Sequence, residues 1–413
     1  MRVSVFTPTH NPRWLDDCYR SLVAQTMPDW EWVVLLNGKA TTWAPPQPDP
    51  RVRVQRAGVK GVGAAKRAAC EIATGDLLVE LDHDDVLVSD CLESLVVAAD
   101  ANPDASLIYS DFAQINEDGS PNSTTFNLEN GWVYTPCVVD GVEQLRCHAM
   151  APSPHNVGYI WYAPNHVRAF RRTAYEAVGG YDASHAILDD QDLMTRLYQH
   201  GEFVHVDKLL YLQRWYPGNT QVDPKINAEI QERTVEFYRD NIEALSLAWA
   251  SRAGLAAISL DTPTSVGSPD IDARFARVRI DPSAPSLPYF DSSVGVIKAL
   301  DVLQRAADRA AFFNECYRVL AHGGMLLTDT PSTDGRGAFQ DPSHVAFYNE
   351  NSFIYLTQLG LRPTIPALTA RLQLSHVLTY WPSDVHEQMH IPYVKGNLIA
   401  VKDGPRQGGP LHV

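Results

Sequence analysis

The first 110 residues alternate short apolar runs with segments of helical periodicity. The apolar runs predict strands over residues 3–6, 32–36, 52–55, 77–81 and 105–110. Between them, apolar residues at helical spacing predict helices over residues 14–25, 64–73 and 90–101. This alternation predicts an α/β fold with a mostly parallel sheet and helices on both faces. Ligands bind such sheets at the carboxyl ends of the strands.

The remaining 300 residues are enough for a second domain. After an irregular stretch over residues 112–165, the pattern predicts helices over 172–178, 189–200 and 226–247, and a strand over 204–206. We expect an α/β domain over residues 1–222, a helical connector over 223–252 and a smaller α/β domain over 253–413. The Pro-, Ser- and Gly-rich segment 261–270 is either a linker or an early loop of the second domain.

Charge and cysteine content exclude several classes of protein. The net charge of −15 argues against binding to a nucleic-acid backbone. The six cysteines contain no C-x-x-C pair, so we expect free thiols in a reducing cytoplasm and neither zinc nor disulfides. No apolar run reaches the length of a membrane span, and the N-terminus resembles a first strand and not a signal peptide.

An acidic turn, Leu81–Asp85, follows the apolar run at residues 77–79. Clustered carboxylates at the end of a buried strand repel one another unless a cation or water neutralises them. Such oxygen ligands suit Mg²⁺ or Mn²⁺, and these ions suit a diphosphate. The alternative is a solvated Asp-rich turn that caps the next helix.

Four motifs in register resemble family 2 glycosyltransferases of the GT-A fold. They are residues 5–12 (VFTPTHNP), 81–85 (LDHDD), 179–182 (GGYD) and 189–193 (DDQDL), and the resemblance covers roughly residues 1–220. It implies a metal-dependent, inverting enzyme that transfers a sugar from a nucleotide-sugar donor, foremost a UDP-sugar, to an acceptor hydroxyl. The acceptor is left open between a protein, a glycan and a small molecule.

The resemblance assigns donor-binding roles to residues on the first strands. Thr7, Pro8 and Thr9 would hold the nucleotide base. Asn37 stands where relatives carry a base-reading Asp, and an amide can donate as well as accept, so the base identity stays open. Lys66 aligns with an Arg that contacts the nucleotide in relatives; the alternative is a surface helix residue.

The resemblance also assigns the metal and the base. Asp82 would contact ribose or metal, and Asp84 would bind the Mn²⁺ or Mg²⁺ that bridges the diphosphate. Asp85 has no role in the resemblance, and its position predicts that it caps the next helix. Asp190 matches the general base that inverting transfer needs near the acceptor hydroxyl. The alternative for Asp190 is an acidic first turn favoured by the helix dipole.

Two further signals accompany these motifs. Relatives often carry a histidine ligand after the last strand, but residues 214–219 contain none, and the strand pattern around His205 favours a packed histidine. Aromatic side chains crowd the irregular stretch and could form a sugar platform or hydrophobic anchors. They are Trp132, Tyr134, His148, His155, Tyr159, Trp161 and Tyr162.

The C-terminal part resembles the later half of class I S-adenosylmethionine (SAM)-dependent methyltransferases. The segments concerned are residues 287–303, 313–327, 341–345 and 348–353. No G-x-G turn follows the expected strand at 256–260, so we expect a degenerate domain without a complete SAM site. Its favoured roles are packing, acceptor docking or assembly into a homo-oligomer.

Two alternatives to a glycosyltransferase remain. In the first, the enzyme is bifunctional and also methylates, with Asp261, Asp301 and His344 as candidate pocket residues. In the second, the chain is a non-catalytic sugar-binding scaffold. The carboxylates Asp82, Asp84 and Asp190 argue against the second alternative, because a scaffold does not need them.

Overall fold

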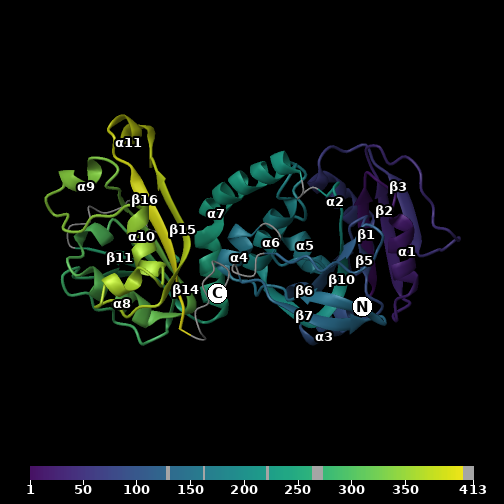
Figure 1. Ribbon diagram of the computed structural model, residues 1–413, viewed down its shortest axis with the longest axis horizontal. Coiled ribbons are helices and arrows are strands. Elements are labelled where there is room, and N and C mark those ends of the chain that lie inside the picture. The colour runs from purple at the N-terminus through teal and green to yellow at the C-terminus, as the bar shows by residue number, and fades with distance from the viewer. Residues whose placement is uncertain (127–130, 161–162, 220–222, 263–272, 403–413) are drawn as a thin grey trace. The chain divides into compact units, whose positions relative to one another are not determined.

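The computed structural model describes residues 1–126, 131–160, 163–219, 223–262 and 273–402. The chain divides into two compact units, and the boundary between Ile242 and Glu243 falls inside the long helix α7 (Pro224–Arg252). Figure 1 traces the first unit from purple to teal and the second from green to yellow. No helix among the described residues is long and apolar enough to cross a membrane.

The first unit is built on one large mixed sheet, with strand order β3-β2-β1-β4-β9-β6-β10-β5 and a hairpin, β7–β8, attached to β6. Its strands are β1 (Val3–Thr9), β2 (Trp30–Leu36), β3 (Val52–Arg56), β4 (Leu77–Glu80), β5 (Val86–Leu87), β6 (Ala105–Asn116), β7 (Tyr134–Val139), β8 (Val142–Cys147), β9 (Arg168–Arg171) and β10 (Glu202–Trp215). Strands β3, β2, β1 and β4 are all parallel. The predicted α/β class with parallel strands is confirmed.

Helices cover this sheet and supply its core. They are α1 (Leu15–Val23), α2 (Val62–Ile72), α3 (Cys91–Ala101), α4 (Pro154–Tyr159), α5 (Arg172–Ala177) and α6 (Asp189–His200). Helices α2, α5 and α6 bury apolar side chains against the sheet, where Phe6, Leu78 and Phe170 meet Leu193 and Leu197. Burial of these side chains removes apolar surface from water and holds the helices in place.

The expectation of an irregular stretch over residues 112–165 is wrong in part. Strand β6 runs on to Asn116, and the hairpin β7–β8 and helix α4 follow. The hairpin turns at Asp140 and Gly141, whose φ angles of 50° and 79° lie in the left-handed region. An Asp-Gly pair suits such a two-residue turn, so the signal was present in the sequence.

The second unit has its own sheet, with strand order β12-β11-β13-β14-β16-β15. Its strands are β11 (Ala256–Asp261), β12 (Ala276–Arg279), β13 (Val294–Leu300), β14 (Leu320–Pro331), β15 (Leu372–Tyr380) and β16 (Tyr393–Ala400). Its helices are α8 (Arg309–Val319), α9 (Gly337–Gln340), α10 (Glu350–Thr357) and α11 (Asp384–Gln388). The first four strands are parallel and β16 is antiparallel to β14. Most of the expected linker, residues 263–270, lies outside the described residues.

All six cysteines are free, as predicted. Five of them are buried, and Cys137 is half-buried. Burial raises the pKa of the Cys18, Cys70 and Cys91 thiols. These three cysteines therefore remain protonated and act as small apolar side chains in the core.

Candidate functional site

The carboxyl ends of β1, β2 and β4 meet at one edge of the first sheet because these strands are parallel neighbours. The backbone N–H of Asn37, just after β2, donates to the Thr9 carbonyl at the end of β1 (2.8 Å). The N–H of Leu81, just after β4, donates to a carbonyl of β1 (3.2 Å). The loop at Thr7–Thr9, Asn37 and the acidic turn beginning at Asp82 therefore share one edge.

The two threonines of this loop use their hydroxyls inside the fold. The Thr7 hydroxyl donates to the Leu81 carbonyl (2.7 Å) and accepts from the indole N–H of Trp32 (2.9 Å). The Thr9 hydroxyl donates to the Asn11 carbonyl (2.8 Å) and accepts from the Asn11 N–H (3.0 Å). Both side chains therefore fix the loop against its neighbours.

Asn37 offers an unused acceptor at this edge. Its amide nitrogen donates to the Val59 carbonyl (3.0 Å), whereas its buried Oδ1 has no hydrogen-bond partner among the described residues. A buried amide oxygen without a donor is unfavourable, so it suits a ligand that brings an N–H. Pro8, which is half-buried, lies in β1 opposite Leu35 of β2.

The acidic turn presents two carboxylates in different settings. The Asp82 side chain is 37% exposed, and its backbone N–H donates to the Tyr211 hydroxyl (3.1 Å). Asp84 is buried and accepts from the side-chain amide of Asn219 (3.4 Å) and from the Tyr216 hydroxyl. Both of these partners follow β10.

The prediction that Asp85 caps the next helix is wrong. Its carboxylate is buried and accepts from the Tyr211 hydroxyl (2.7 Å) and from the backbone N–H of Arg214 (2.7 Å). Burial, with the neighbouring Asp84 charge, raises the pKa of Asp85 well above its usual range. Asp90 occupies the N-cap of α3, although its side chain makes no capping bond. Asp85 instead ties the acidic turn to β10.

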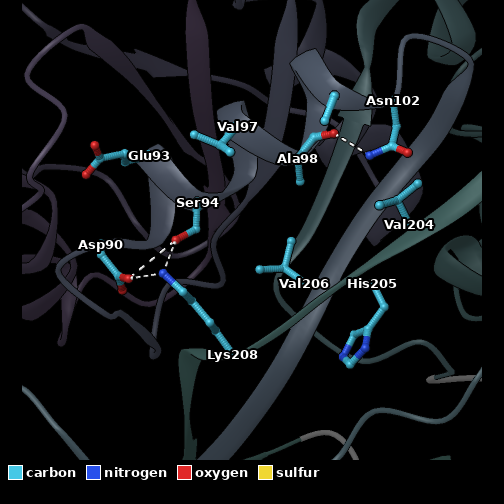
Figure 2. A pocket seen from close by; sticks show the side chains of 11 residues that line it. Asp90, Glu93, Ser94, Val97, Ala98, Asn102, Val204, His205, Val206 and Lys208 are labelled. Carbon is cyan, nitrogen blue, oxygen red and sulfur yellow. Dashed lines mark hydrogen bonds and ion pairs between the residues drawn. The ribbon is translucent and has the colours of Figure 1, made fainter.

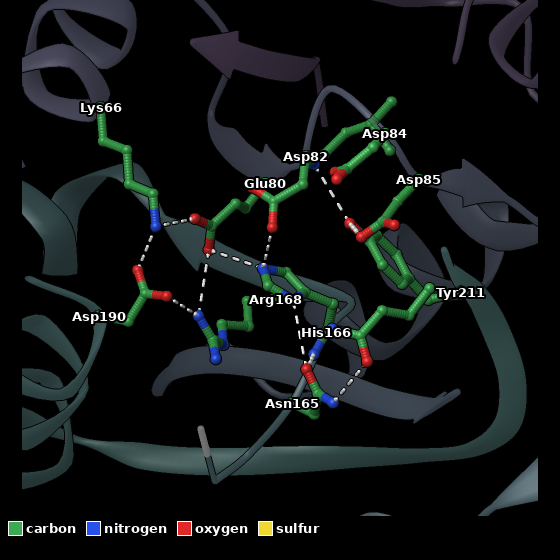
Figure 3. A network of polar contacts seen from close by, with 12 residues as sticks. Lys66, Glu80, Asp82, Asp84, Asp85, Asn165, His166, Arg168, Asp190 and Tyr211 are labelled. Atoms are coloured by element: carbon green, nitrogen blue, oxygen red, sulfur yellow. Dashed lines mark hydrogen bonds and ion pairs between the residues drawn. The ribbon is translucent and has the colours of Figure 1, made fainter. Parts of the chain in front are cut away.

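Three carboxylates surround the buried ammonium of Lys66, and Figure 3 shows two of them, those of Glu80 and Asp190. Its Nζ lies 2.7 Å from Glu80 Oε1 and 3.1 Å from Asp189 Oδ2, and it also pairs with Asp190. Burial opposes the charge, but the surrounding carboxylates hold the pKa of Lys66 well above its usual range. Lys66 was expected at the nucleotide; here its ammonium donates a hydrogen bond to Asp190 and forms ion pairs with Glu80 and Asp189.

Close packing of helix α2 brings Lys66 to this position. A Cβ on Gly63 would lie 2.4 Å from the Asp182 carbonyl oxygen, so only glycine allows this approach to the loop before α6. Lys66 stands one helical turn further along α2 and reaches the start of α6. The Gly-Gly-Tyr-Asp motif and Lys66 therefore belong to one packing arrangement.

Asp190 is held by a second cation, Arg168 of β9. The Arg168 Nη1 lies 2.7 Å from Asp190 Oδ2 and 3.5 Å from Glu80 Oε2. Burial alone would raise the pKa of Asp190, but Lys66 and Arg168 outweigh it and hold the pKa well below the ordinary value. Burial raises the pKa of the adjacent Asp189 to about 7, although Lys66 opposes this shift. Asp190 is therefore ionised at neutral pH.

His166 joins the acidic turn to this network. Its Nε2 is buried without a hydrogen-bond partner and lies 3.4 Å from Glu80 Oε2 and 3.7 Å from Asp82 Oδ2. Ligand atoms of Glu80, Asp82 and His166 all lie within 4.8 Å of one another. Carboxylate oxygens with an imidazole nitrogen can hold a divalent cation. Asp84, the expected ligand, is not part of this group.

Sequence reasoning missed Glu80, His166 and Arg168. A signal existed for Glu80, because a charge inside the apolar run Leu-Leu-Val-Glu-Leu requires a buried partner. His166 and Arg168 gave no comparable signal. They lie beside β4 only because β9 inserts antiparallel between β4 and β6.

A second charged cluster lies on β6, β8 and β10. The His205 ring, expected in the core, is half-exposed and lies 2.7 Å from Asp111 Oδ1. Arg146 pairs with both Asp111 and Asp207, and His148 Nδ1 lies 3.5 Å from Asp111. The arginine already neutralises these carboxylates, so this cluster has the character of a structural ion-pair network.

The aromatic side chains of residues 132–159 mostly serve as anchors. Trp132 is buried against Phe126, with ring centroids 4.8 Å apart. His155 and Tyr159 pack against Tyr238 of α7, with centroids 6.4 and 5.6 Å apart. Trp161 and Tyr162 lie outside the described residues.

In the second unit, the candidate pocket residues are engaged with their neighbours. Asp261 accepts from Arg277 Nε (2.7 Å), and Asp301 accepts from the Gln304 amide (3.2 Å). A ring nitrogen of His344 lies 3.1 Å from a backbone carbonyl of α9. Burial raises the pKa of the Asp301 carboxyl.

Comparison with protein families finds two matches along the chain. Residues 4–178 match the model described as glycosyl transferase family 2. Residues 234–328 match the model described as a methyltransferase domain. The first match contains β1, β2, β4 and the acidic turn, and the second contains β11 to β13.

Curated relatives share parts of the chain. An uncharacterized protein, y4gI of Sinorhizobium fredii, is 29% identical over 52% of this chain and 23% of its own length. Chondroitin synthase of Escherichia coli is 23% identical over 53% of this chain and 30% of its own length. A probable SAM-dependent methyltransferase of Mycolicibacterium smegmatis is 36% identical over 19% of this chain and 33% of its own length. The chain thus spans about a third or less of these relatives.

Solved structures with a similar chain path include TarS of S. aureus. Residues 1–349 of TarS give a TM-score of 0.41 at 14% identity, over 62% of this chain and 71% of that one. Its complex with UDP-GlcNAc gives 0.43 at 13% identity, over 62% of this chain and 72% of that one. From the two family matches, the chain carries a family 2 glycosyltransferase domain at its N-terminus and a methyltransferase domain at its C-terminus.

Proposed function

We propose that this chain is a metal-dependent, inverting glycosyltransferase that moves a sugar from a nucleotide-sugar donor to an acceptor hydroxyl. The family match over residues 4–178 supports the reaction class. The observation that carries the proposal is the continuous charged network from Asp82 through His166 and Glu80 to Asp190. It joins the edge of the sheet at which we place the donor to an ionised carboxylate.

The donor would lie along the edge formed by Thr7–Thr9, Asn37 and Asp82. The unpaired Oδ1 of Asn37 would accept an N–H from the base, as the ring N–H of uracil provides, so a UDP-sugar is our first choice. Asp82 and His166, with Asp84 close by, would hold Mn²⁺ or Mg²⁺. When bound, such a cation neutralises the negative charge of the departing diphosphate.

Asp190 would act as the general base. Its carboxylate would accept the proton of the acceptor hydroxyl while that oxygen attacks the anomeric carbon from the face opposite the leaving group. Lys66 and Arg168 would keep Asp190 ionised and fix its direction. The chondroitin synthase among the relatives favours a glycan as acceptor.

The proposal can be tested without knowledge of the acceptor. We would screen nucleotide sugars for thermal stabilisation of the protein in Mn²⁺. We would then measure hydrolysis of the stabilising donor, in which water takes the place of the acceptor, by release of the nucleoside diphosphate. Asp84→Ala and Asp190→Ala should each lower this release at least tenfold. Unchanged turnover in both variants would contradict the proposal.

A bifunctional enzyme is the second candidate, since residues 234–328 match a methyltransferase domain. Strand β12 is followed by Asp281, an exposed acid at a position suited to a ribose. Calorimetry of the full chain with SAM tests this candidate. Saturable heat would support methyl transfer. The absence of both binding heat and a thermal shift would reject it.

A further inference from the structure

A groove runs between helix α3 and the first half of strand β10 (Figure 2). Its volume is about 570 Å³. Glu93, Val97 and Ala98 line it from one face of α3, and Val204 and Val206 line it from β10. Val97 is 64% exposed and gives this groove an apolar contact surface. We call this feature the α3–β10 groove.

The strand side of this groove is an open sheet edge. Residues 203–206 of β10 pair on one side with β6, in parallel register with residues 107–110. On the other side β10 pairs with β5 only at Tyr211 and Leu212. In the described part of the chain, no strand covers the outer edge of residues 202–208. In a parallel sheet the backbone N–H and C=O groups of alternate residues are directed to the strand on one side and to the strand on the other. Every second residue of this segment therefore directs its N–H and C=O groups to the side that carries no strand.

The groove also carries an uncompensated negative charge at one end. Asp90 is neutralised by Lys208, whose Nζ lies 2.8 Å from its carboxylate. Glu93 is exposed and accepts a hydrogen bond from Thr26 (2.7 Å), and no cation lies within ion-pair distance of it among the described residues.

We propose that the α3–β10 groove binds an extended peptide of a partner protein as an added strand on β10. Unpaired backbone groups select an extended chain over a helix or a small molecule, because only an extended chain satisfies them in series. Alternate apolar side chains of the peptide would contact Val97 and Val206, and a basic residue would pair with Glu93. The bulge at Asp207 and Lys208 limits the added strand to about four residues, at the ~3.3 Å rise of a strand.

The probe for this proposal is a fluorescein-labelled hexapeptide of alternating valine and threonine with a lysine at each end. The same peptide with proline at a central position is the matched control, because proline lacks the N–H that a ladder needs. Binding is measured by anisotropy on the full chain, and backbone hydrogen exchange is followed at residues 203–206. The variants are Val97→Asp and Glu93→Lys, with Asp100→Lys as an exposed control on the same helix outside the groove.

We expect saturable binding of the probe, slower amide exchange at residues 203–206, and at least tenfold weaker binding in Val97→Asp and Glu93→Lys. Asp100→Lys should bind like the unmodified protein. Absence of saturation at millimolar peptide, or equal binding of the proline peptide, would overturn the proposal. Sedimentation that shows self-association lost in Val97→Asp would also overturn it, because a second copy would then occupy the groove.

Discussion

At the scale of single residues, the balance of charge around Asp190 decides what this site can do. Lys66 and Arg168 reach its carboxylate from two different elements, and both are almost fully buried. They keep Asp190 ionised, which a base requires, but they also weaken its affinity for a proton. The neighbouring Asp189 has its pKa raised to about 7, so the two acids differ in protonation near neutral pH.

Removal of one of these cations should change the pH dependence of turnover. In Arg168→Gln the pKa of Asp190 rises, because an opposite charge at contact lowers a carboxyl pKa by roughly 1–3 units. The acid limb of kcat/KM should therefore move to higher pH by about 1 unit or more. Arg196→Gln is the matched control, because Arg196 pairs with Asp192 on the same helix. An acid limb that stays in place in Arg168→Gln would assign the titration to another acid, such as Asp189, whose pKa is raised by burial to about 7.

Glu80 should contribute to the stability of the fold as well as to the positions of Lys66 and Arg168. It is almost fully buried and lies in contact with Lys66 and Arg168. Glu80→Gln leaves these buried cations short of a partner, which costs about 3–5 kcal/mol when a buried pair is broken. Urea unfolding measures the loss, with Arg20→Gln of an exposed pair as the control, expected within about 1 kcal/mol. Equal losses in both variants would contradict a buried network.

At the scale of elements, Glu31 of β2 joins its neighbouring segments. It accepts hydrogen bonds from Ser4 of β1 and from Thr74 before β4, and it pairs with Arg53 of β3. Burial opposes its charge, but these bonds lower the pKa of Glu31 from 4.5 to about 2. A carboxyl with a lowered folded-state pKa stabilises the fold above its unfolded pKa and loses that contribution as the pH falls.

Glu31→Gln should therefore be destabilising at pH 7, and its difference from the unmodified protein should shrink as the pH falls from about 4.5 to about 2. Urea midpoints over this range give the comparison. Glu71→Gln, at an exposed position on α2, is the control. A loss of stability that is the same at pH 7 and pH 2 would show that the charge of Glu31 has no part in it.

The elements also show what the sequence could and could not predict. Apolar periodicity located β1 to β4 and α1 to α3, because these elements alternate locally along the chain. Strand β10 was expected over residues 204–206 but runs from Glu202 to Trp215. The charged residue Arg214 interrupts the apolar pattern by which a buried strand is predicted. Arg214 is nevertheless buried, because it donates hydrogen bonds to the acidic turn. Strand β9 was missed because only its long-range pairing defines it.

The same distinction applies to the site. Thr7–Thr9, Asp82 and Asp190 could be located because short motifs carry them. Glu80 and His166 could not, because their proximity depends on how β9 lies beside β4. Short motifs therefore predicted the candidate site residues. The fold supplied the partners that fix the protonation state and the orientation of those side chains.

At the scale of the whole molecule, each unit has its own apolar core. Phe170 belongs to a core formed only by residues of the first unit, and Phe353 to one formed only by residues of the second. Domains with separate cores can unfold in separate steps. Calorimetry should show two unfolding transitions. Phe170→Ala should destabilise the first unit alone and Phe353→Ala the second unit alone, each by about 3–5 kcal/mol in the free energy of unfolding. A single transition lowered equally by both would contradict this division.

The central claim is that Asp190 and the edge at Asp82 form one sugar-transfer site. Donor turnover by Asp190→Asn tests it most directly, with donor affinity measured on the same samples and Asp192→Asn as the control. Turnover should fall by about 100-fold or more while donor affinity stays within twofold, since a general base contributes roughly 10²–10⁴ to the rate. Turnover of Asp190→Asn within twofold of the unmodified enzyme would contradict the claim.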